Sequence, residues 1–553
     1  MKYTSRIIAA ALVAAAVLAL LVVPAGCAQR AQKSPESESI FDASPGAQAG
    51  GENTGQAVSG AEDAAAGDEN PGMDDSDGGA LREVVYMYPW YGTIPSGVSD
   101  VEDAINAITE EKIKVHITLK PVSFATFSQQ MSLALAGDEK IDLVTIPDDF
   151  LTMLSQDQLM DITGLLESSG KEILDAVGIF ISGTMRDGRI YGVTPMGGKA
   201  TSVHFLMRTD WLEETGIDVE QIIPVEDISD MEKNLEIIEA IFAQVKENHP
   251  EANILVASEG ELDLDRLICY DTMGDGLGVI LGGDNNEIVN LYSSEAYRMV
   301  VLLAQRWQRD GYIAKDASFT TASFGDILKA GNTFCDLAIT QQGVEAQYKQ
   351  TTGYDFTAVQ LCLPLLYTGY SLTHVNAVPK CTTEPEGAID FLNLMYTDKD
   401  IVNLLAYGVE GKHYHFMANG TVDYPEGVNA QNSEYPCSQT WLFGNTFLDY
   451  VKVGNVPELY EIQARGNETA RRSTAFGFIY DNSAVLSEVT ACTRLVEQYS
   501  YGLMTGELSL DMLDEFNEKL EDAGINKIIQ EKQRQFDEWR VLNENNPDTG
   551  TGE

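Results

Sequence analysis

Residues Arg189 to Gly216 read RIYGVTPMGGKATSVHFLMRTDWLEETG. We call this segment the turning point, because the chain is expected to pass there from one lobe to the other. A break at Pro195 and two adjacent glycines separate an extended start from a second extended run, Ser202 to Met207. The apolar and β-branched residues of that run suit a pleated, half-buried surface. A short helix is expected directly afterwards, with an N-cap at Thr209 or Asp210 and a glycine at its end. A loop, a strand and an immediate helix predict the point where the chain leaves one α/β lobe and enters another.

The residues before this point alternate between strand and helix patterns. Strands are predicted at 83–88, 113–119 and 141–146, where apolar and β-branched residues gather. Helices are predicted between them, the first opened by a capping box at Ser99 and the second carrying Phe124 on its apolar stripe. This order predicts a parallel sheet with helices on both faces, and such sheets bind ligands at the carboxyl ends of their strands.

The chain after the turning point predicts a second α/β lobe and then a helical C-terminal third. We expect the two lobes to be joined by extended crossovers near Ser202 to Phe205 and His374 to Ala377. At 553 residues the chain is too long for one core. The expected divisions are a signal peptide at 1–26, a tether at 27–80, an N-terminal lobe of 81–203 plus 375–438, a C-terminal lobe of 204–374 plus 439–541, and a frayed tail at 542–553.

The first residues have the pattern of a bacterial lipoprotein signal. Lys2 and Arg6 precede an apolar run, Ile7 to Val23, that is short for a transmembrane helix. The residues before Cys27 are similar to a lipobox, whose cysteine is acylated (for example with palmitate), although Pro24 stands where leucine is usual. We therefore expect a lipid anchor at Cys27 on the outer face of the bacterial cell membrane. A plain secretory signal is the alternative.

Composition limits the partners of the chain. Residues 28–80 are Gly, Ala, Ser, Pro, Asp and Glu with hardly an aromatic, so they form an acidic tether that cannot build a core. The whole chain has 85 acidic and 36 basic residues, a net charge of -49, which argues against nucleic acid and anionic lipid surfaces as partners.

Six cysteines follow Cys27, and none forms a CxxC pair. Cys335 and Cys362 lie in apolar runs, which favours buried thiols that act as small hydrophobic side chains. An extracytoplasmic location also allows disulfides, and the sequence leaves their pairing open.

Several segments resemble extracellular solute-binding proteins, the receptor subunits of ABC importers. Residues 407–414 (YGVEGKHY) and 441–445 (WLFGN) are similar to segments of a branch of carbohydrate-type, family 1-like lipoproteins. The tail from Phe476 to Gln533 resembles the DUF3502-type C-terminal domain of the same branch. The turning point matches the family's Tyr-Gly-x-x-Pro, Met-Arg, Asp-Trp-Leu and Gly-Ile pattern in Tyr191, Gly192, Pro195, Met207, Arg208, Asp210, Trp211, Leu212, Gly216 and Ile217.

The resemblance implies an α/β, type II periplasmic-binding-protein fold, with two lobes joined by a hinge and a ligand cleft between them. It implies an extracytoplasmic, monomeric substrate-binding subunit of an ABC importer that needs no cofactor. Such a subunit captures a sugar or oligosaccharide by lobe closure and delivers it to the permease subunits. Two alternatives stay open: a receptor of the same fold for a peptide or another polar solute, and a secreted polysaccharide-cleaving lipoprotein.

Candidate ligand-binding residues follow from the chemistry of sugar sites. Aromatic faces cover the apolar C–H side of a pyranose, while carboxylates, amides and arginine satisfy its hydroxyls. We expect Trp90 and Trp441 on opposite walls of the cleft. Core packing is the alternative for each aromatic residue, and a helix cap is the alternative for the aspartates. The predicted set is Tyr88, Trp90, Tyr91, Asp148, Asp149, Arg208, Tyr270, Asp271, Gln341, Gln342 and Trp441.

The sequence favours binding over catalysis. Asp148 and Asp149 are adjacent, so they cannot flank a glycosidic bond at the separation that hydrolysis requires. GxSxG, HExxH and P-loop patterns are absent, and the GxGxG at 274–278 is not a dinucleotide fingerprint. His413 and His415 share one side of a predicted strand but lack a third ligand, so we expect no metal site. No residue is assigned a catalytic role.

Overall fold

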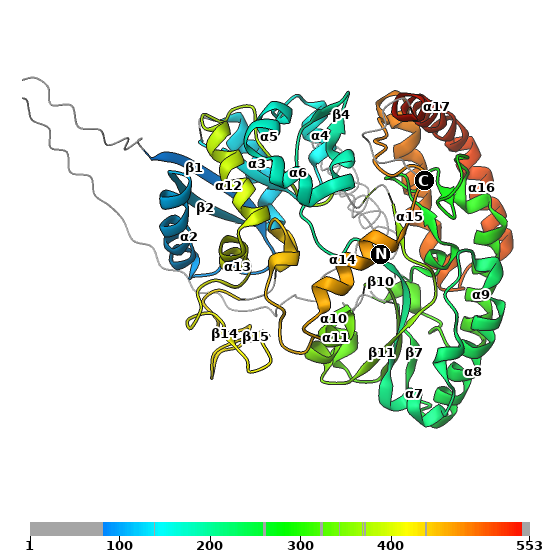
Figure 1. Cartoon of the computed structure of the whole chain (residues 1–553). Coiled ribbons are helices and arrows are strands. Elements are labelled where there is room, and N and C mark those ends of the chain that lie inside the picture. Colours follow the sequence, from blue (N-terminus) through cyan, green and yellow to red (C-terminus); the bar gives the residue numbers. More distant parts are fainter. Residues whose placement is uncertain are drawn as a thin grey trace, which may run out of the picture. The chain divides into compact units, whose positions relative to one another are not determined.

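The computed structural model describes residues 81–544 except 138, 258–261, 321–323, 342, 368, 370–371 and 437–438. Within this part the chain builds two four-stranded sheets, and helices pack on both faces of each sheet (Figure 1). The expected α/β fold with two sheet-centred lobes is therefore confirmed.

The first sheet has the strand order β13-β3-β1-β2. Its central strand β1 pairs in parallel with β2 and β3, as the strand and helix alternation predicts, whereas β13 runs antiparallel to β3. The strands are β1 (Arg82–Trp90), β2 (Val115–Ser123), β3 (Leu143–Ile146) and β13 (Val375–Ala377).

Alternate residues of β1 face two different cores, as the period of a strand requires. Tyr86, Tyr88 and Trp90 pack in one cluster with α2 and α12, and Met87 packs in the other with α3 and α4. The helix α2 begins at Val98 with no side-chain cap, so the capping box predicted at Ser99 is wrong. The helices of this lobe are α2 (Val98–Lys112), α3 (Phe124–Ala136), α4 (Phe150–Ser155), α5 (Thr163–Ser169), α6 (Lys171–Val177), α12 (Pro385–Thr397) and α13 (Lys399–Tyr407).

The second sheet has the order β11-β6-β10-β7 and is mixed. The strand β6 is antiparallel to both β10 and β11, and β10 is parallel to β7. The strands are β6 (Ser202–Arg208), β7 (Asn253–Leu255), β10 (Thr333–Thr340) and β11 (Phe356–Gln360). The helices of this lobe are α7 (Thr209–Thr215), α8 (Glu232–Asn248), α9 (Glu295–Asp310), α10 (Phe324–Lys329) and α11 (Val344–Thr352).

The predicted turning point has the expected strand and helix, with two corrections. The strand β6 is fully paired in the second sheet, so the connection between the sheets lies before Ser202 rather than at Ser202 to Phe205. The N-cap of α7 is Arg208 and has no side-chain cap, because the Asp210 carboxylate instead accepts hydrogen bonds from the Arg208 guanidinium. Gly216 ends α7 in the left-handed conformation, as expected.

The three helices predicted at the C-terminal end are present: α15 (Leu486–Met504), α16 (Leu510–Ala523) and α17 (Ile525–Glu544); α14 (Leu459–Thr469), which precedes them, was not predicted. Helices α15 and α16 complete the core of the second sheet. The buried ammonium of Lys532 on α17 binds the carboxylate of Asp275 and the carbonyl oxygen of Gly278. Leu442 and Phe443 pack in the core of the first sheet, so the lobe boundary expected at 439 differs from the packing.

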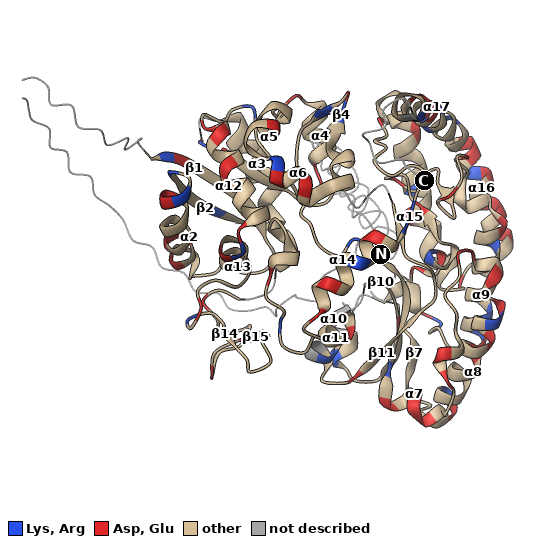
Figure 2. Ribbon diagram, viewed as in Figure 1, with Lys and Arg blue, Asp and Glu red and all other residues tan. Residues whose placement is uncertain are grey.

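Short elements fill the connections. They include the two-residue strands β4 (Met185–Arg186), β5 (Arg189–Ile190), β8 (Tyr270–Asp271), β9 (Ile280–Leu281), β12 (Leu365–Leu366), β14 (His415–Phe416), β15 (Val422–Asp423) and β16 (Arg471–Arg472). The 3-10 turns include η1 (Gly178–Thr184), η4 (Leu264–Ile268), η6 (Ala317–Phe319) and η8 (Thr440–Leu442). Figure 2 shows Lys and Arg scattered among more numerous Asp and Glu along the helices of both lobes.

Candidate ligand-binding site

The first sheet brings four strand ends to one edge. The parallel strands β1, β2 and β3 all end there, and β13 begins there because it is antiparallel to β3. Val375, the first residue of β13, is paired with Ile146, the last residue of β3. The backbone N–H of His374 consequently donates to the carbonyl oxygen of Pro147, at 3.1 Å. Side chains that follow or precede these strands therefore gather at one place.

Four aromatic rings meet at this edge, and we call them the aromatic cluster: Tyr91, Phe124, His374 and Trp441. The ring of Tyr91 stacks on Phe124 with centroids 4.4 Å apart and lies 5.2 Å from Trp441. The imidazole of His374 lies 4.7 Å from Trp441 and 6.0 Å from Tyr91. Phe124 is 41% exposed and the other three are half-buried, so the cluster keeps aromatic surface open to solvent.

Local contacts fix the cluster. The buried side chain of Gln439 clamps the backbone of Tyr91: its Oε1 accepts from the Tyr91 N–H at 3.3 Å, and its Nε2 donates to the Tyr91 carbonyl at 2.9 Å. This clamp ties η8, and with it Trp441, to the end of β1. The hydroxyl of Tyr91 shares a hydrogen bond of 2.8 Å with Nε2 of His374.

His374 has an unusual backbone conformation and an unusually low side-chain pKa. Its φ of 55° lies in the left-handed region, which is uncommon for residues other than glycine. Burial, and then the charge of Lys199, lower the pKa of His374 to about 3. The imidazole is therefore neutral at pH 7, with one nitrogen as a donor and the other as an acceptor.

Two carboxylates follow β3 at the same edge of the sheet. Asp148 is exposed, and desolvation followed by the charge of Asp149 raises its pKa. The carboxylate of Asp149 accepts a hydrogen bond of 2.7 Å from the hydroxyl of Ser128 on α3. Asp149 stands at the N-cap position of α4 but makes no side-chain capping bond, so both carboxylates offer oxygens at this edge.

Tyr88 and Trp90 have a different environment from the one expected. Tyr88 is 0% exposed and Trp90 is 2% exposed, because their shared face of the central strand β1 is covered. The ring of Tyr88 lies 5.3 Å from Phe443, and that of Trp90 lies 5.4 Å from Tyr435. Trp441 packs with Tyr91 in the same lobe, so the expectation that Trp90 and Trp441 form opposite walls is wrong.

Three predicted residues of the second lobe are held by their own neighbours. The Arg208 guanidinium is bidentate on Asp210 (2.7 and 2.8 Å), donates to the carbonyl of Gly331 and stacks on the rings of Trp211 and Tyr354. The hydroxyl of Tyr270 donates to the carboxylate of Asp265 at 2.5 Å.

Asp271 is buried as well, and it accepts from the N–H of Met273 at 2.9 Å. The donors and acceptors of these three residues are thus engaged within the second lobe.

Gln341 remains as a polar group of the second lobe beside the inter-sheet connection. Its Oε1 is buried and has no hydrogen-bond partner within the described structure. A Cβ on Gly198 would lie 1.7 Å from this oxygen and 3.0 Å from Cδ of Gln463 on α14. The two amide side chains thus occupy the space that a side chain at residue 198 would need. Gln342 lies outside the described residues.

Sequence reasoning missed Phe124, His374, Gln439 and Gln463. Phe124 was expected in a core stripe and His374 in a crossover, yet both lie directly at the ends of strands of the first sheet. Neither lies next to a predicted strand end, because the second strand was predicted over 113–119 and His374 was expected within the crossover, so no local signal marked them. Gln439 and Gln463 had none, because their contacts depend on residues far away in sequence.

One group in the described part of the chain has the donor types of a metal site. Ligand atoms of Asp100, His413 and Glu434 lie within 4.8 Å of one another. The ammonium of Lys412 already bridges the two carboxylates, at 2.6 Å and 2.9 Å. Nδ1 of His413 accepts from the N–H of Val409 at 2.9 Å, so the neutral ring carries its proton on Nε2.

A protonated nitrogen cannot ligate a metal, and a cation already lies between the carboxylates. This arrangement fits an ion-pair contact between α2 and the segment 409–414, not a metal centre. His415, the other member of the predicted pair, is not part of the group.

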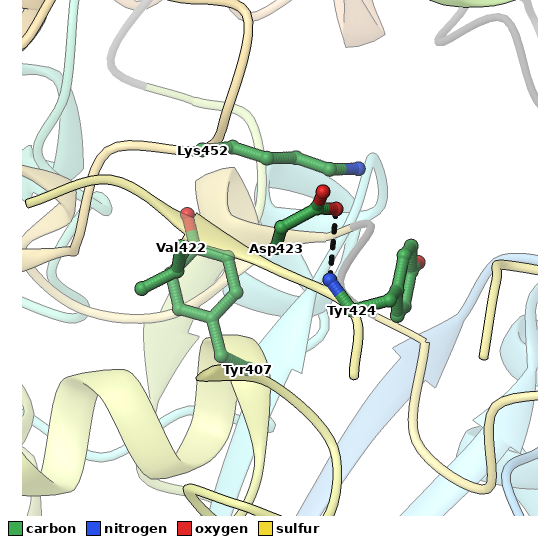
Figure 3. Close-up of a pocket in the computed structure, with 5 residues that line it drawn as sticks. All are labelled: Tyr407, Val422, Asp423, Tyr424 and Lys452. Atoms are coloured by element: carbon green, nitrogen blue, oxygen red, sulfur yellow. Dashed lines mark hydrogen bonds between the residues drawn. The ribbon is translucent and has the colours of Figure 1, made fainter. Parts of the chain in front are cut away.

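A shallow hollow lies elsewhere on the first lobe, beside β15 (Figure 3). It is lined by Tyr407, Val422, Asp423, Tyr424 and Lys452, and it is too small to enclose a water molecule. The Asp423 carboxylate accepts from the N–H of Tyr424 at 2.8 Å. The hollow is too small for a sugar ring, so the aromatic cluster is the better candidate.

Known proteins share this architecture. A carbohydrate ABC transporter substrate-binding protein of Streptococcus pneumoniae serotype 4 is 23% identical over 477 residues, which cover 83% of this chain and 91% of that protein. The crystal structure of the N-glycan transport solute binding protein NgtS of S. pneumoniae has a TM-score of 0.71 at 22% identity and covers 83% of this chain and 99% of that one. This chain has the solute-binding-protein fold.

Two further matches agree with this fold. An HMO-binding, ABC-transporter-associated solute-binding protein of Bifidobacterium longum infantis has a TM-score of 0.57 at 13% identity, covering 83% of this chain and 99% of that one. Residues 474–541 match the family described as "Domain of unknown function (DUF3502)", where the sequence predicted a domain of that type. Within the described residues, no helix is long and apolar enough to span a membrane.

Proposed function

We propose that this chain is the extracytoplasmic substrate-binding subunit of an ABC importer, and that it captures a sugar or oligosaccharide without turning it over. The observation that carries the proposal is the aromatic cluster at the carboxyl edge of the first sheet. An open parallel sheet binds ligands at this edge, and exposed aromatic faces there are otherwise costly to leave in water. The names of the similar proteins point to the same class of ligand.

The cluster matches the two chemistries of a pyranose. The exposed faces of Phe124 and Trp441 cover the apolar C–H side of the ring, where stacking removes apolar surface from water. The oxygens of Asp148 and Asp149 accept from sugar hydroxyls. The paired hydroxyl and imidazole of Tyr91 and His374 are neutral and add a donor or acceptor of their own.

Roles differ among the predicted ligand-binding residues. Tyr91, Trp441, Asp148 and Asp149 are proposed to touch the ligand, together with Phe124 and His374. Gln341 is proposed to reach it from the second lobe, as is Gln342. The buried Tyr88 and Trp90 are proposed to stabilise the end of β1, which positions Tyr91. Arg208, Tyr270 and Asp271 are proposed to stabilise the second lobe.

Binding is proposed to close the two lobes by rotation about the connection at 194–201 and the second crossover before β13. The importer's permease subunits then receive the closed form. Cys27 and the tether lie outside the described residues, and we propose that acylation of Cys27 is the only membrane attachment. Replacing Cys27 with Ala should release the protein from membranes without changing its affinity for the sugar.

Isothermal titration calorimetry of the full chain tests the proposal. The solved structures of the S. pneumoniae protein include complexes with Man1GlcNAc and Man5GlcNAc, so mannose- and N-acetylglucosamine-containing oligosaccharides are the first probes. A saturable heat with at least one of a panel of neutral oligosaccharides is expected, and Phe124→Ala should weaken it about tenfold or more.

The matched control is Phe319→Ala, which removes a phenylalanine ring that is 78% exposed on η6, in the other lobe. It should leave the affinity unchanged. Binding of peptides in place of every oligosaccharide would overturn the sugar assignment, and cleavage of an oligosaccharide during the titration would overturn the transport role.

A further inference from the structure

Two buried cysteines of the second lobe lie side by side, outside the proposed sugar site. Cys269 follows η4 and is 8% exposed, whereas Cys362 follows β11 and is 2% exposed. Sγ of Cys269 lies 3.8 Å from the carbonyl oxygen of Leu267, and Sγ of Cys362 lies 4.0 Å from the same oxygen. The fold therefore brings two thiols that are distant in sequence against a single atom.

Backbone hydrogen bonds hold both cysteines in place. The carbonyl of Cys269 accepts from the N–H of Gly282 at 2.9 Å. Both residues that flank Cys362 bind Val225: the carbonyl of Leu361 accepts from it and the N–H of Leu363 donates to it, each at 2.9 Å. Cys269 has a φ of 57°, a left-handed conformation that few residues other than glycine adopt. The approach of the two sulfurs is thus built into the backbone.

Contact between the two thiols also affects the pKa of Cys362. A hydrogen bond to Cys269 is the largest cause that raises the pKa of the Cys362 thiol, and burial is the second. A protonated thiol is a poor nucleophile. The Cys362 thiol is therefore a poor nucleophile once the lobe has folded, so covalent chemistry between the two sulfurs belongs to the folding chain.

We propose that Cys269 and Cys362 form a disulfide as the protein folds outside the cytoplasm. The proposal rests on the extracytoplasmic location in the proposed function. The oxidant is a protein or small-molecule disulfide. One cysteine thiolate attacks it to give a mixed disulfide, and the second thiolate displaces the reduced donor. Two S–H bonds are lost and one S–S bond forms; two protons leave, and two electrons reduce the donor disulfide to two thiols.

The bond would cross-link the segment that leads into β8 to the connection between β11 and β12. A loop of about 90 residues would be closed, which restricts the unfolded chain more than the folded one. The midpoint of thermal unfolding is therefore expected to fall by roughly 5 °C or more when the bond is reduced.

The full chain, purified after secretion, tests the pairing. The protein is denatured with iodoacetamide present, digested without reductant and mapped by mass spectrometry. A second sample is reduced, refolded in a mixture of reduced and oxidised glutathione, and mapped in the same way. We expect a cross-linked peptide pair that contains Cys269 and Cys362 in both samples, and its loss after dithiothreitol.

Two variants sharpen the result. Cys362→Ser should abolish the cross-link and remove the effect of dithiothreitol on the unfolding midpoint. The control Cys492→Ser removes another buried cysteine, whose Sγ lies 3.9 Å from the carbonyl of Leu520, and it should keep the cross-link. Full alkylation of Cys269 and Cys362 after glutathione refolding would overturn the proposal, as would either cysteine bonded to a third. No ligand enters these assays, so a failure of sugar binding leaves their outcome unaffected.

Discussion

The hydroxyl of Tyr91 lies 2.8 Å from Nε2 of His374, although 283 positions separate the two residues in the sequence. The contact arises because Tyr91 follows the central strand of the first sheet, whereas His374 precedes the antiparallel strand at its edge. One hydrogen bond thus joins the start of the first lobe to the second crossover. It also gives the aromatic cluster a neutral polar centre.

The stability of the protein should depend on pH through His374. The pKa of this residue falls from its ordinary value of 6.5 to about 3 on folding. Below about pH 6.5 the unfolded chain binds a proton at His374 that the folded chain does not, so the contribution of the neutral ring is full above that pH and is lost progressively towards pH 3. The loss is about 1.4 kcal/mol for each pH unit at most.

Denaturant unfolding of the wild type and of His374→Gln at pH 7 and pH 5 measures this effect. Glutamine keeps a polar partner for Tyr91 and does not titrate. The wild type should lose more stability than the variant between the two pH values. Equal losses in both proteins would show that His374 titrates normally.

Trp90 and Trp441 should respond in opposite ways to truncation. Trp441→Ala removes a half-buried ring of the aromatic cluster, so we expect oligosaccharide affinity to fall by about thirtyfold, or about 2 kcal/mol. Trp90→Ala empties a core position that is 2% exposed, so the free energy of unfolding should fall by about 3–5 kcal/mol. Calorimetry and a denaturant melt of each variant separate the two effects. A Trp441→Ala protein that binds normally would remove this ring from the site.

The contrast between Trp90 and Tyr91 shows what sequence can and cannot predict here. Local pattern placed the strand, and hence the carboxyl edge of the sheet, with its end two residues early, at 88 instead of Trp90. It could not show that Tyr435 and Phe443 return to cover the face that carries Tyr88 and Trp90. The long-range partner decides whether an aromatic residue is core or site. Strand period alone says only which residues share a face.

The dependence on partners that are distant in sequence also explains the other wrong predictions about site residues. Arg208 matches a family pattern, but its partners Gly331 and Tyr354 come from distant segments that no local pattern reveals. His374 and Phe124 show the opposite error, because the sequence analysis did not assign them to the site although they lie in the aromatic cluster. Their exposure depends on the edge where four strands meet, and β13 is too short to register strongly in a sequence.

A side chain at residue 198 should displace Gln341, whereas one at its neighbour Gly197 should not. A Cβ at Gly198 would lie 1.7 Å from Oε1 of Gln341, but a Cβ at Gly197 would lie 3.3 Å from the nearest atom, Oγ1 of Thr446. Gly198→Ala should therefore displace the amide of Gln341, which is the end of a flexible side chain, so we expect little loss of stability and a loss of part of the oligosaccharide affinity. Gly197→Ala is the matched control and should change either quantity little. Equal affinities in the two variants would exclude Gln341 from the site.

Asn467 on α14 should control the mobility of the connection between the sheets. Its Oδ1 accepts from the N–H groups of Lys199 and Ala200, at 2.7 Å and 2.9 Å, and its Nδ2 donates to the carbonyl of Gly197 at 2.8 Å. One side chain therefore satisfies three backbone groups of the segment that must flex if the lobes rotate. Removing it leaves those groups to water and should cost about 1–3 kcal/mol.

Hydrogen exchange measured on Asn467→Ala and Asn467→Asp distinguishes the contribution of the Oδ1 acceptor from that of the Nδ2 donor. The alanine variant loses both, so the amides of Lys199 and Ala200 should exchange faster, by roughly tenfold or more, because each is held by Oδ1 in the wild type. The aspartate variant keeps an acceptor oxygen and should retain much of the protection, while it loses the bond to Gly197. Unchanged exchange at both amides in the alanine variant would mean that other contacts hold the connection, and that α14 does not restrain lobe rotation through this residue.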